Sequence, residues 1–312
     1  MASTQYGLSI VEPLGHINGI IGGITDVRVE SGLTEVVQST DGSIDARFVA
    51  AMTQVSRIRF KTNDIRGALE VAGFNGAPFS AADTITALAF YFRKRLAGGA
   101  FEGGEGFIAY MFNGILVPIG LRAAHGQIAE IEIEAIPVYD GTILPLQLDT
   151  GVPVSVGNTP SRLWTVGPWY VNGTLLEGIR DFSLDFGLDV ELLEADGIPW
   201  PTKASIKQRR PRFECNTFHL DAVDKDVLAL IGQARSGVTR AFLRKKLEGG
   251  ANTPDGTIGH IRFDVAEGRI AMQDLSDGHP DSAMCRIGVT PTKTGATDPI
   301  AINVNVVIGT GA

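Results

Sequence analysis

Few residues in this sequence have the spacing that catalysis or metal binding requires. The only cysteines are Cys215 and Cys285, which form no C-x-x-C pair and have no histidine at the spacing of a zinc ligand. We therefore expect two reduced thiols in the core. No histidine lies in an H-x-x-x-H, H-x-E or G-x-S-x-G context, so only convergence in the fold could build a zinc site or a catalytic triad. We predict no enzymatic activity and no catalytic, metal-binding or cofactor-binding residues. The five histidines are His16, His125, His219, His260 and His279.

A run of alternating glutamates is the most regular acidic pattern. Glu130, Glu132 and Glu134 alternate with apolar residues, so they would project in parallel from one face of a strand. A metal ion needs carboxylates that converge, and a solvated strand face is the simpler interpretation. If the chain surrounds a channel, these three carboxylates are candidates for an acidic lumen wall.

Two sets of basic residues could contact a polyanion or a neighbouring subunit. For the segment from Lys207 to Arg212, contact with DNA, a solvated loop and salt bridges to another subunit all stay open. The second set is an Arg-Lys-Arg run that recurs as Arg-Lys-Lys in the second half of the chain. Recurrence favours a structural position, such as pairing with acidic groups of a neighbour, over a phosphate site. The candidate inter-subunit residues are Lys207, Arg209, Arg210, Arg212, Arg93, Lys94, Arg95, Arg244, Lys245 and Lys246.

The composition is that of a globular protein with many turns. Of 312 residues, 44% are hydrophobic, 20% are charged and 38 are glycines, which suits short strands better than long helices. The net charge of −8 disfavours sequence-specific binding of nucleic acid, although an acidic surface could let DNA slide past. We find neither a signal-peptide pattern nor an apolar run long enough for a membrane helix. We expect a protein made in a reducing cytoplasm, with no membrane contact.

The sequence repeats itself, which predicts a duplicated domain. The segment GITDVRVESGL, Gly23 to Leu33, matches GIRDFSLDFGL, Gly178 to Leu188, which lies 155 residues further on. At the same spacing the pattern Val-x-Pro from Val11 matches the one from Val166.

The matches continue in the same order through the rest of both halves. RKRLAGGA from Arg93 matches RKKLEGGA from Arg244, 151 residues later. The boundary should lie in the Gly-, Pro- and Ser-rich segment from Asp149 to Arg162, which separates domains 1–157 and 158–312. Further matched residues are Phe112 with Phe263 at the spacing of 151, and Ile133 with Ile287 and Pro137 with Pro291 at a spacing of 154.

Apolar residues alternate with polar ones over much of each half, which is typical of half-buried strands. The segments 84–96 and 239–247 are predicted as long strands, and Asp41-Gly42 and Asp196-Gly197 as hairpin turns. One helix per half is expected, capped by Asp64 and by Asp224. The predicted fold class is mainly β, with two tandem β-sandwich or barrel-like domains that each carry one short flanking helix.

The second half resembles a known family. The stretch GIRDFSLDFGLDVELLEADGIPWPTKASIKQRRPRF, residues 178 to 213, is similar to the central hairpin of phage tail tube proteins. In that family a strand leads to a long loop, an x-P-T stretch and a second strand. The Asp-capped helix and the strand TRAFLRKKLEGG then follow in the family's order. The resemblance covers most of the second half and extends through the repeat to the first.

This resemblance implies that the chain is a major tail protein of a virion with two tail-tube domains. Single-domain tube proteins form hexameric rings, so a duplicated chain would form a homotrimer with pseudo-sixfold symmetry. Such rings would stack into a hollow tube for DNA ejection, with the loops Asp41 to Arg57 and Asp196 to Arg212 reaching the adjacent ring. Implied partners are further copies of the chain, the tape measure, terminator and distal tail proteins, and DNA in passage. The implied location is the virion tail, assembled in the host cytoplasm.

Three alternatives stay open at this point. A receptor- or glycan-binding module would display aromatic side chains on loops, and Trp164, Trp169 and Trp200 all lie near the start of the second half. A tail terminator or hub ring would use the same domain at another place in the virion. An enzyme would need a pocket with converging polar groups. Whether the tail contracts is also open, because a sheath would be a separate chain.

Overall fold

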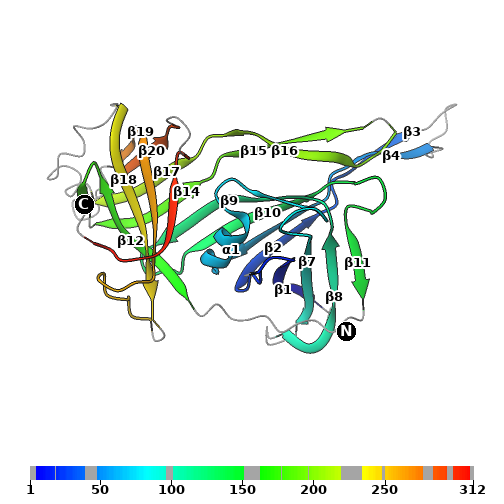
Figure 1. Cartoon of the computed structure of the whole chain (residues 1–312), viewed down its shortest axis with the longest axis horizontal. Coiled ribbons are helices and arrows are strands. Elements are labelled where there is room, and N and C mark those ends of the chain that lie inside the picture. The colour runs from blue at the N-terminus through cyan, green and yellow to red at the C-terminus, as the bar shows by residue number, and fades with distance from the viewer. Residues whose placement is uncertain are drawn as a thin grey trace.

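A computed structural model shows that the protein is mainly β, as predicted (Figure 1). Within the described part of the chain, strands β1 to β21 are joined by turns and accompanied by one short helix, α1. The described residues are 5–17, 19–38, 48–95, 101–150, 162–176, 178–195, 197–218, 234–247, 250–276, 284–293 and 298–309.

The first half contains strands β1 to β11 and helix α1. They are β1 (Gln5–Leu14), β2 (Ile24–Glu30), β3 (Leu33–Gln38), β4 (Phe48–Gln54), β5 (Arg57–Thr62), α1 (Ile65–Ala72), β6 (Ala77–Phe79), β7 (Ala87–Arg95), β8 (Phe101–Met111), β9 (Gly114–Ala124), β10 (Glu130–Pro137) and β11 (Gln147–Thr150).

The second half follows a similar succession. Its strands are β12 (Leu163–Val171), β13 (Thr174–Leu176), β14 (Ile179–Asp185), β15 (Leu188–Glu194), β16 (Pro201–Arg209), β17 (Arg212–Phe218), β18 (Ala234–Lys246), β19 (His260–Ser276), β20 (Met284–Pro291) and β21 (Ala301–Val306). Of the predicted turns and helices, Asp41-Gly42, Asp196 of the second turn and the helix after Asp224 lie outside the described residues, as does most of the predicted linker.

Strand pairing follows the same order in the two halves. In the first, β1, β7, β8 and β11 form one sheet, and β2, β5, β10 and β9 lie side by side in another. In the second, β12, β18, β19 and β21 pair in the same succession, and so do β14, β17, β20 and β19. Strand β19 serves both series because it is long: residues 260–269 pair with β18 or β21, and residues 268–276 pair with β20.

The registers of these pairs also recur, including their irregularities. Strands β2 and β5 shift register between Ile24 and Asp26, and β14 and β17 shift between Ile179 and Asp181. The partners agree as well, since Val27 lies opposite Phe60 and the residues 155 positions later, Phe182 and Cys215, lie opposite each other. The spacing that the sequence predicted for this part of the chain is therefore also the spacing of the strand registers.

Two of the sequence matches are wrong in register. In the pairs of β1 with β7 and β12 with β18, Val11 lies opposite Phe90 and Trp169 lies opposite Ala241, so Trp169 and not Val166 takes the place of Val11. Phe263 likewise takes the place of Ala109, because each lies opposite the matching residue of β7 or β18. Matches of one or two residues, such as Val-x-Pro or a single Phe, are too short to determine register. The hydrogen-bonded strand pairs determine it directly.

A glycine hinge connects each long hairpin to the sheet. Gly32, after β2, and Gly187, after β14, have φ of +58° and +59°, a conformation that favours glycine. A Cβ atom would lie 2.0 Å from the carbonyl oxygen of Val55 at the first hinge and of Arg210 at the second. Each glycine carbonyl instead accepts a hydrogen bond from the backbone N–H of that same residue. The hairpins therefore leave both halves at the same kind of bend.

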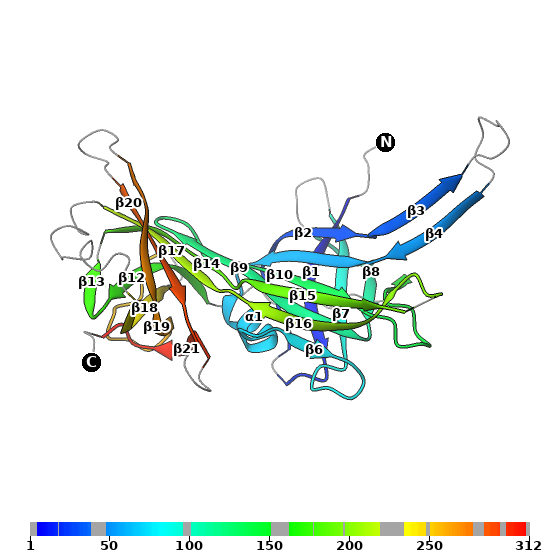
Figure 2. The ribbon, with the colours of Figure 1, turned by 90° about the horizontal axis from the view of Figure 1, so that it is seen from above.

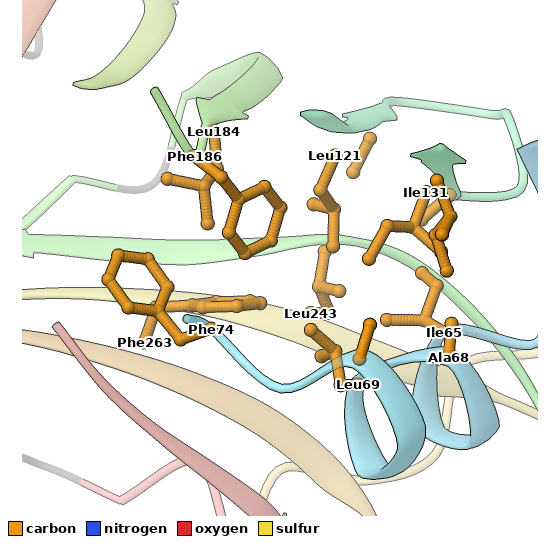
Figure 3. Close-up of a cluster of buried hydrophobic side chains, with 14 of the residues drawn as sticks. Ile65, Ala68, Leu69, Phe74, Leu121, Ile131, Leu184, Phe186, Leu243 and Phe263 are labelled. Atoms are coloured by element: carbon orange, nitrogen blue, oxygen red, sulfur yellow. The ribbon is translucent and has the colours of Figure 1, made fainter. Parts of the chain in front are cut away.

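One hydrophobic core runs through both halves (Figure 3). Leu121 of β9 and Leu184 of β14, which face each other across the junction, belong to it together with Phe263 of β19. Helix α1 covers the first-half side with Ile65, Ala68 and Leu69, and its N-cap Asp64 accepts a hydrogen bond from the Gly67 N–H, as the sequence predicted. Because the core is shared, the two halves pack as one body.

Candidate interaction surfaces

The two halves are joined edge to edge by strands β9 and β14. Five residue pairs run antiparallel from Asp181 opposite Ala124 to Asp185 opposite Gly120. Two further backbone bonds extend the junction: Phe186 N–H donates to the Ile119 carbonyl, and His125 N–H donates to the Arg180 carbonyl (3.1 and 2.7 Å). Backbone pairing, which does not depend on side-chain type, thus makes one continuous sheet from two sheets of the same order.

At each end of this series, from β2 to the second part of β19, one strand edge has no partner among the described strands. Strand β2 is the last strand of the sheet, and its Val29 side chain is 52% exposed. At the other end, residues 270–276 of β19 pair with β20 on one side, and no described strand pairs with their other side. These two edges correspond to β14 and β9, the strands that pair inside the chain. Open edges expose unpaired N–H and C=O groups that can accept another strand.

The β15–β16 hairpin of the second half packs on the first half (Figure 2). Its apolar side chains cover a small cluster formed by Ile115, Val117 and Ile136 on the outer face of β9 and β10. Gly76 marks one contact, since a Cβ there would lie 3.1 Å from both Ile206 and Val117. The hairpin residues that take part are Leu188, Val190, Leu192, Ala204 and Ile206.

Hydrogen bonds and rings fix the far end of this contact. The N–H groups of Gln54 and Tyr139 donate to the carbonyls of Pro199 and Pro201 (2.6 and 2.8 Å). The Trp200 indole Nε1–H donates to the Gln54 amide Oε1 (3.1 Å), and its ring packs 5.2 Å from that of Tyr139. Residues 197–212 belong to a segment expected to reach an adjacent ring, and within this chain they lie along the first half.

The corresponding β3–β4 hairpin has the same register but no described cover. Leu33 pairs with Gln54 and Val37 with Val49, as Leu188 pairs with Arg209 and Leu192 with Ala204. Figure 2 shows β3 and β4 extending beyond the body of the molecule. Three of its apolar side chains are exposed, at 42% for Leu33, 59% for Val37 and 58% for Val49.

The three predicted lumen-facing carboxylates differ in environment. They share one strand face, but Glu134 is buried and its Oε1 accepts hydrogen bonds from Arg59 Nε (2.7 Å) and Arg57 Nη1 (3.3 Å). The carboxylate in turn raises the pKa of the Arg59 guanidinium through its hydrogen bond and its charge. Glu134 is therefore a paired structural group, whereas Glu130 and Glu132 are half-buried and line an open groove.

That groove runs across the junction and carries charges of both signs. Its volume is about 930 Å³, and its walls come from the outer faces of β9, β10, β14 and neighbouring strands. Arg286 and Arg212 both pair with Glu214 inside it. The sheet face is thus mixed in charge and not a purely acidic stripe. Its charged residues are Glu130, Glu132, Asp181, Asp185, Glu214, Lys61, Arg122, Arg212 and Arg286.

The basic cluster from Lys207 to Arg212 is largely satisfied within the chain. Lys207 pairs with Glu191 across the hairpin at 3.7 Å, with both side chains exposed. Arg209 pairs with Asp298 at 3.0 Å and lies over the Phe74 ring. Arg210 is exposed, and its backbone N–H donates a hydrogen bond to the Gly187 carbonyl. A role between subunits stays a prediction for all four residues.

The recurring basic runs occupy matching places on β7 and β18. Arg93, which is buried, lies opposite Gly7, and Lys94 and Arg95 follow it along the β1 edge. Arg244 lies opposite Thr165 and pairs with Asp255 at 2.8 Å. The matched strand pairing supports the structural interpretation of these runs. In the second run the N–H of Lys245 donates to His260 Nδ1, and Lys246 Nζ donates to the Gly250 carbonyl (3.0 and 3.2 Å).

The candidate chemical groups are dispersed or buried. Cys215 and Cys285 are buried free thiols, as predicted, and burial raises the pKa of both. His260 is buried and its pKa is lowered, mainly by desolvation. Within the described residues no three His, Cys, Asp or Glu side chains gather closely enough to hold a metal ion. His219 and His279 lie outside the described residues.

The tryptophans do not form an exposed aromatic platform. Trp164 and Trp169 are each 1% exposed, and Trp169 packs against Phe182 and Phe213 in the core. Trp200 is half-buried between Tyr139 and Gln54. The aromatic display that a glycan-binding module would need is therefore missing at these three residues.

Comparison with protein-family models and with curated proteins yields no match for this chain. Among the described helices, none is long and apolar enough to cross a membrane. The hairpin contact and the edge junction were not foreseen from the sequence. The sequence does contain a signal for the hairpin contact. Every second residue of β15 is apolar at Leu188, Val190 and Leu192, whereas the matching residues of β3 are Leu33, Glu35 and Val37.

Proposed function

We propose that this chain is a structural protein that assembles with copies of itself into rings, and that the rings stack into the hollow tube of a phage-type tail. The observation that carries the proposal is the β9–β14 junction. It joins two halves of matching strand order, and no described strand pairs with the outer edge of β2 or with the matching edge of residues 270–276 in β19. A molecule with complementary ends of this kind can add copies head to tail until the series closes.

The tail-tube assignment comes from the resemblance of residues 178–213, and the matching strand order of the two halves supports the duplication on which it depends. On this proposal domains 1–157 and 158–312 act as two successive members of a pseudo-sixfold ring, so three chains complete it. No chemistry is required. Other tail proteins and passing DNA are the proposed partners.

The charge pattern fits a conduit for DNA. If the outer sheet face with Glu130 and Glu132 lines the bore, phosphates would meet acidic and basic side chains side by side. A mixed surface neither binds the polymer tightly nor excludes it, because the fields of neighbouring opposite charges largely cancel and salt screens the remainder beyond a Debye length of about 8–10 Å. Which face lines the bore is part of the proposal.

Electron microscopy of the purified protein at rising concentration tests the proposal. We expect rings or tubes with three- or sixfold symmetry. A protein that stays monomeric and compact at the highest soluble concentration, by microscopy and by sedimentation, would contradict it. Rings that never stack would favour a terminator or hub position in the tail.

A further inference from the structure

We infer that the β3–β4 hairpin of one chain clasps the outer face of β19 and β20 in the next chain of the ring. The inference rests on the proposed assembly and names its lateral contact. The structure contains a template for it, because the β15–β16 hairpin already makes the matching contact on β9 and β10 within one chain. The occupant is therefore a second copy of this chain.

The two hairpins agree residue by residue. Both shift register at the same place, after Thr34 in the first hairpin and after Asp189 in the second. The face that β15–β16 buries with Leu188, Val190, Leu192, Ala204 and Ile206 is made in β3–β4 by Leu33, Glu35, Val37, Val49 and Ala51. These five first-hairpin residues are exposed in the single chain.

The surface that β15–β16 covers on β9 and β10 has a counterpart on β19 and β20, which is the receiving surface. The pairs of β10 with β9 and of β20 with β19 share register and bulge, so Ile115, Val117 and Ile136 correspond to Arg269, Ala271 and Thr290. The first three side chains are buried under the hairpin, whereas the last three are exposed. No described hairpin covers this receiving face.

The side chains fit a contact between separate molecules. Where the internal contact has Val190 and Ile115, the proposed one has Glu35 on the hairpin and Arg269 on the receiving face, which are opposite in charge. Val37 and Val49 supply apolar surface. A contact that must stay soluble before assembly is expected to be more polar than a permanent internal one.

The β9–β14 pairing inside the chain also predicts the register between β2 of one chain and β19 of the next. Transferring the β9–β14 pairing places Arg28, Val29 and Glu30 of β2 opposite residues 276, 275 and 274 of the next chain's β19. Val29 is half exposed and Glu30 is paired with Arg28 at 2.8 Å in the single chain. Strand pairing and clasp would thus form together, as they do inside the chain.

A disulfide trap tests the clasp. Ala51 and Ala271 correspond to Ile206 and Val117, the side chains that meet at Gly76 in the internal contact. The double variant Ala51→Cys/Ala271→Cys, assembled and then oxidised with glutathione disulfide, should give covalent multimers on a non-reducing denaturing gel. The native thiols are buried and should not interfere. The control Thr34→Cys/Ala271→Cys places the first thiol on the opposite face of the same hairpin and should stay monomeric on the gel.

A second pair of variants tests the energetic role. Val37→Asp/Val49→Asp places charges on exposed positions, so the monomer should fold, as checked by circular dichroism. It should need at least about 100-fold more protein to assemble, because apolar burial is replaced by desolvation of two carboxylates. Thr34→Asp adds the same kind of charge on the opposite face, where β15 already carries Asp189, and should assemble like the unmodified chain.

The outcomes separate the clasp from the ring. If the unmodified chain forms rings, while the disulfide trap fails or the double aspartate variant assembles normally, the clasp is wrong and the ring proposal stands. If the unmodified chain never assembles, both proposals fail. Covalent multimers from the trap, but not from its control, support the clasp directly.

Discussion

Glu134 is the group whose removal the structure predicts most directly. Its side chain is 4% exposed and its Oε1 lies 2.7 Å from Arg59 Nε and 3.3 Å from Arg57 Nη1. Glu134 also lies directly opposite Arg59 in the β10–β5 ladder, and Arg59 lies opposite Arg28 in β2. The carboxylate therefore offsets a cluster of arginines next to the open β2 edge.

The free-energy cost of replacing Glu134 depends on how exposed its partners Arg57 and Arg59 are. A hydrogen bond to a charged group contributes about 1.5–3 kcal/mol when buried, while exposed pairs contribute about 0.2–1 kcal/mol. The arginine side chains are 32% and 38% exposed, which places these bonds between the two ranges. Glu134→Gln keeps the volume and one acceptor but loses the charge. We expect it to cost about 1–2 kcal/mol, and Glu134→Ala about 2–3 kcal/mol.

Urea unfolding followed by circular dichroism measures this cost. Glu132→Gln is the matched control, because it removes the same charge from a half-buried position on the same strand face, and it should change stability by less than about 0.5 kcal/mol. A double-mutant cycle with Arg59→Gln should show coupling of about 1 kcal/mol. Equal stability of Glu134→Gln and the unmodified protein, or a coupling near zero, would refute the assignment of Glu134 as a structural ion pair.

Two further predictions concern stability. Burial lowers the pKa of His260 because desolvation disfavours the charged imidazolium, and Nδ1 accepts a hydrogen bond from the Lys245 N–H. With its folded pKa below the unfolded value, the contribution of His260 to stability is complete above about pH 6.5 and is lost as pH falls through the folded pKa. His260→Gln should thus show a smaller drop in unfolding free energy between pH 7.5 and 5.5, and equal drops would contradict this. Gly187→Ala should lower the free energy of unfolding by more than about 1 kcal/mol. Its φ is +59°, and the added Cβ atom would lie 2.0 Å from the Arg210 carbonyl oxygen. Thermal unfolding of this variant beside Gly197→Ala, where φ is +78° but no atom lies within 4 Å of the added Cβ, separates the clash from the backbone term.

Local patterns in the sequence determined the class of the fold. Alternation of apolar and polar residues predicts strands wherever one face is buried, and β7, β10 and β18 lie where that period indicated. The Asp64 cap and the following apolar residues likewise predicted α1. These features depend on residues close together in the chain, so the sequence suffices to find them.

Long-range pairing was decided only by the tertiary structure. No local period says that β9 pairs with β14, because strand edges pair through backbone groups that nearly all residues share. Nor does a local period say that β15–β16 lies over Ile115 and Val117, because this contact joins side chains far apart in the chain. The same reason explains the errors of alignment at Val166 and Phe263, where short identities were weaker guides than the ladder. The sequence also placed Glu134 with two solvated neighbours, whereas the fold brings Arg57 and Arg59 to it from β5 and makes it a buried ion pair.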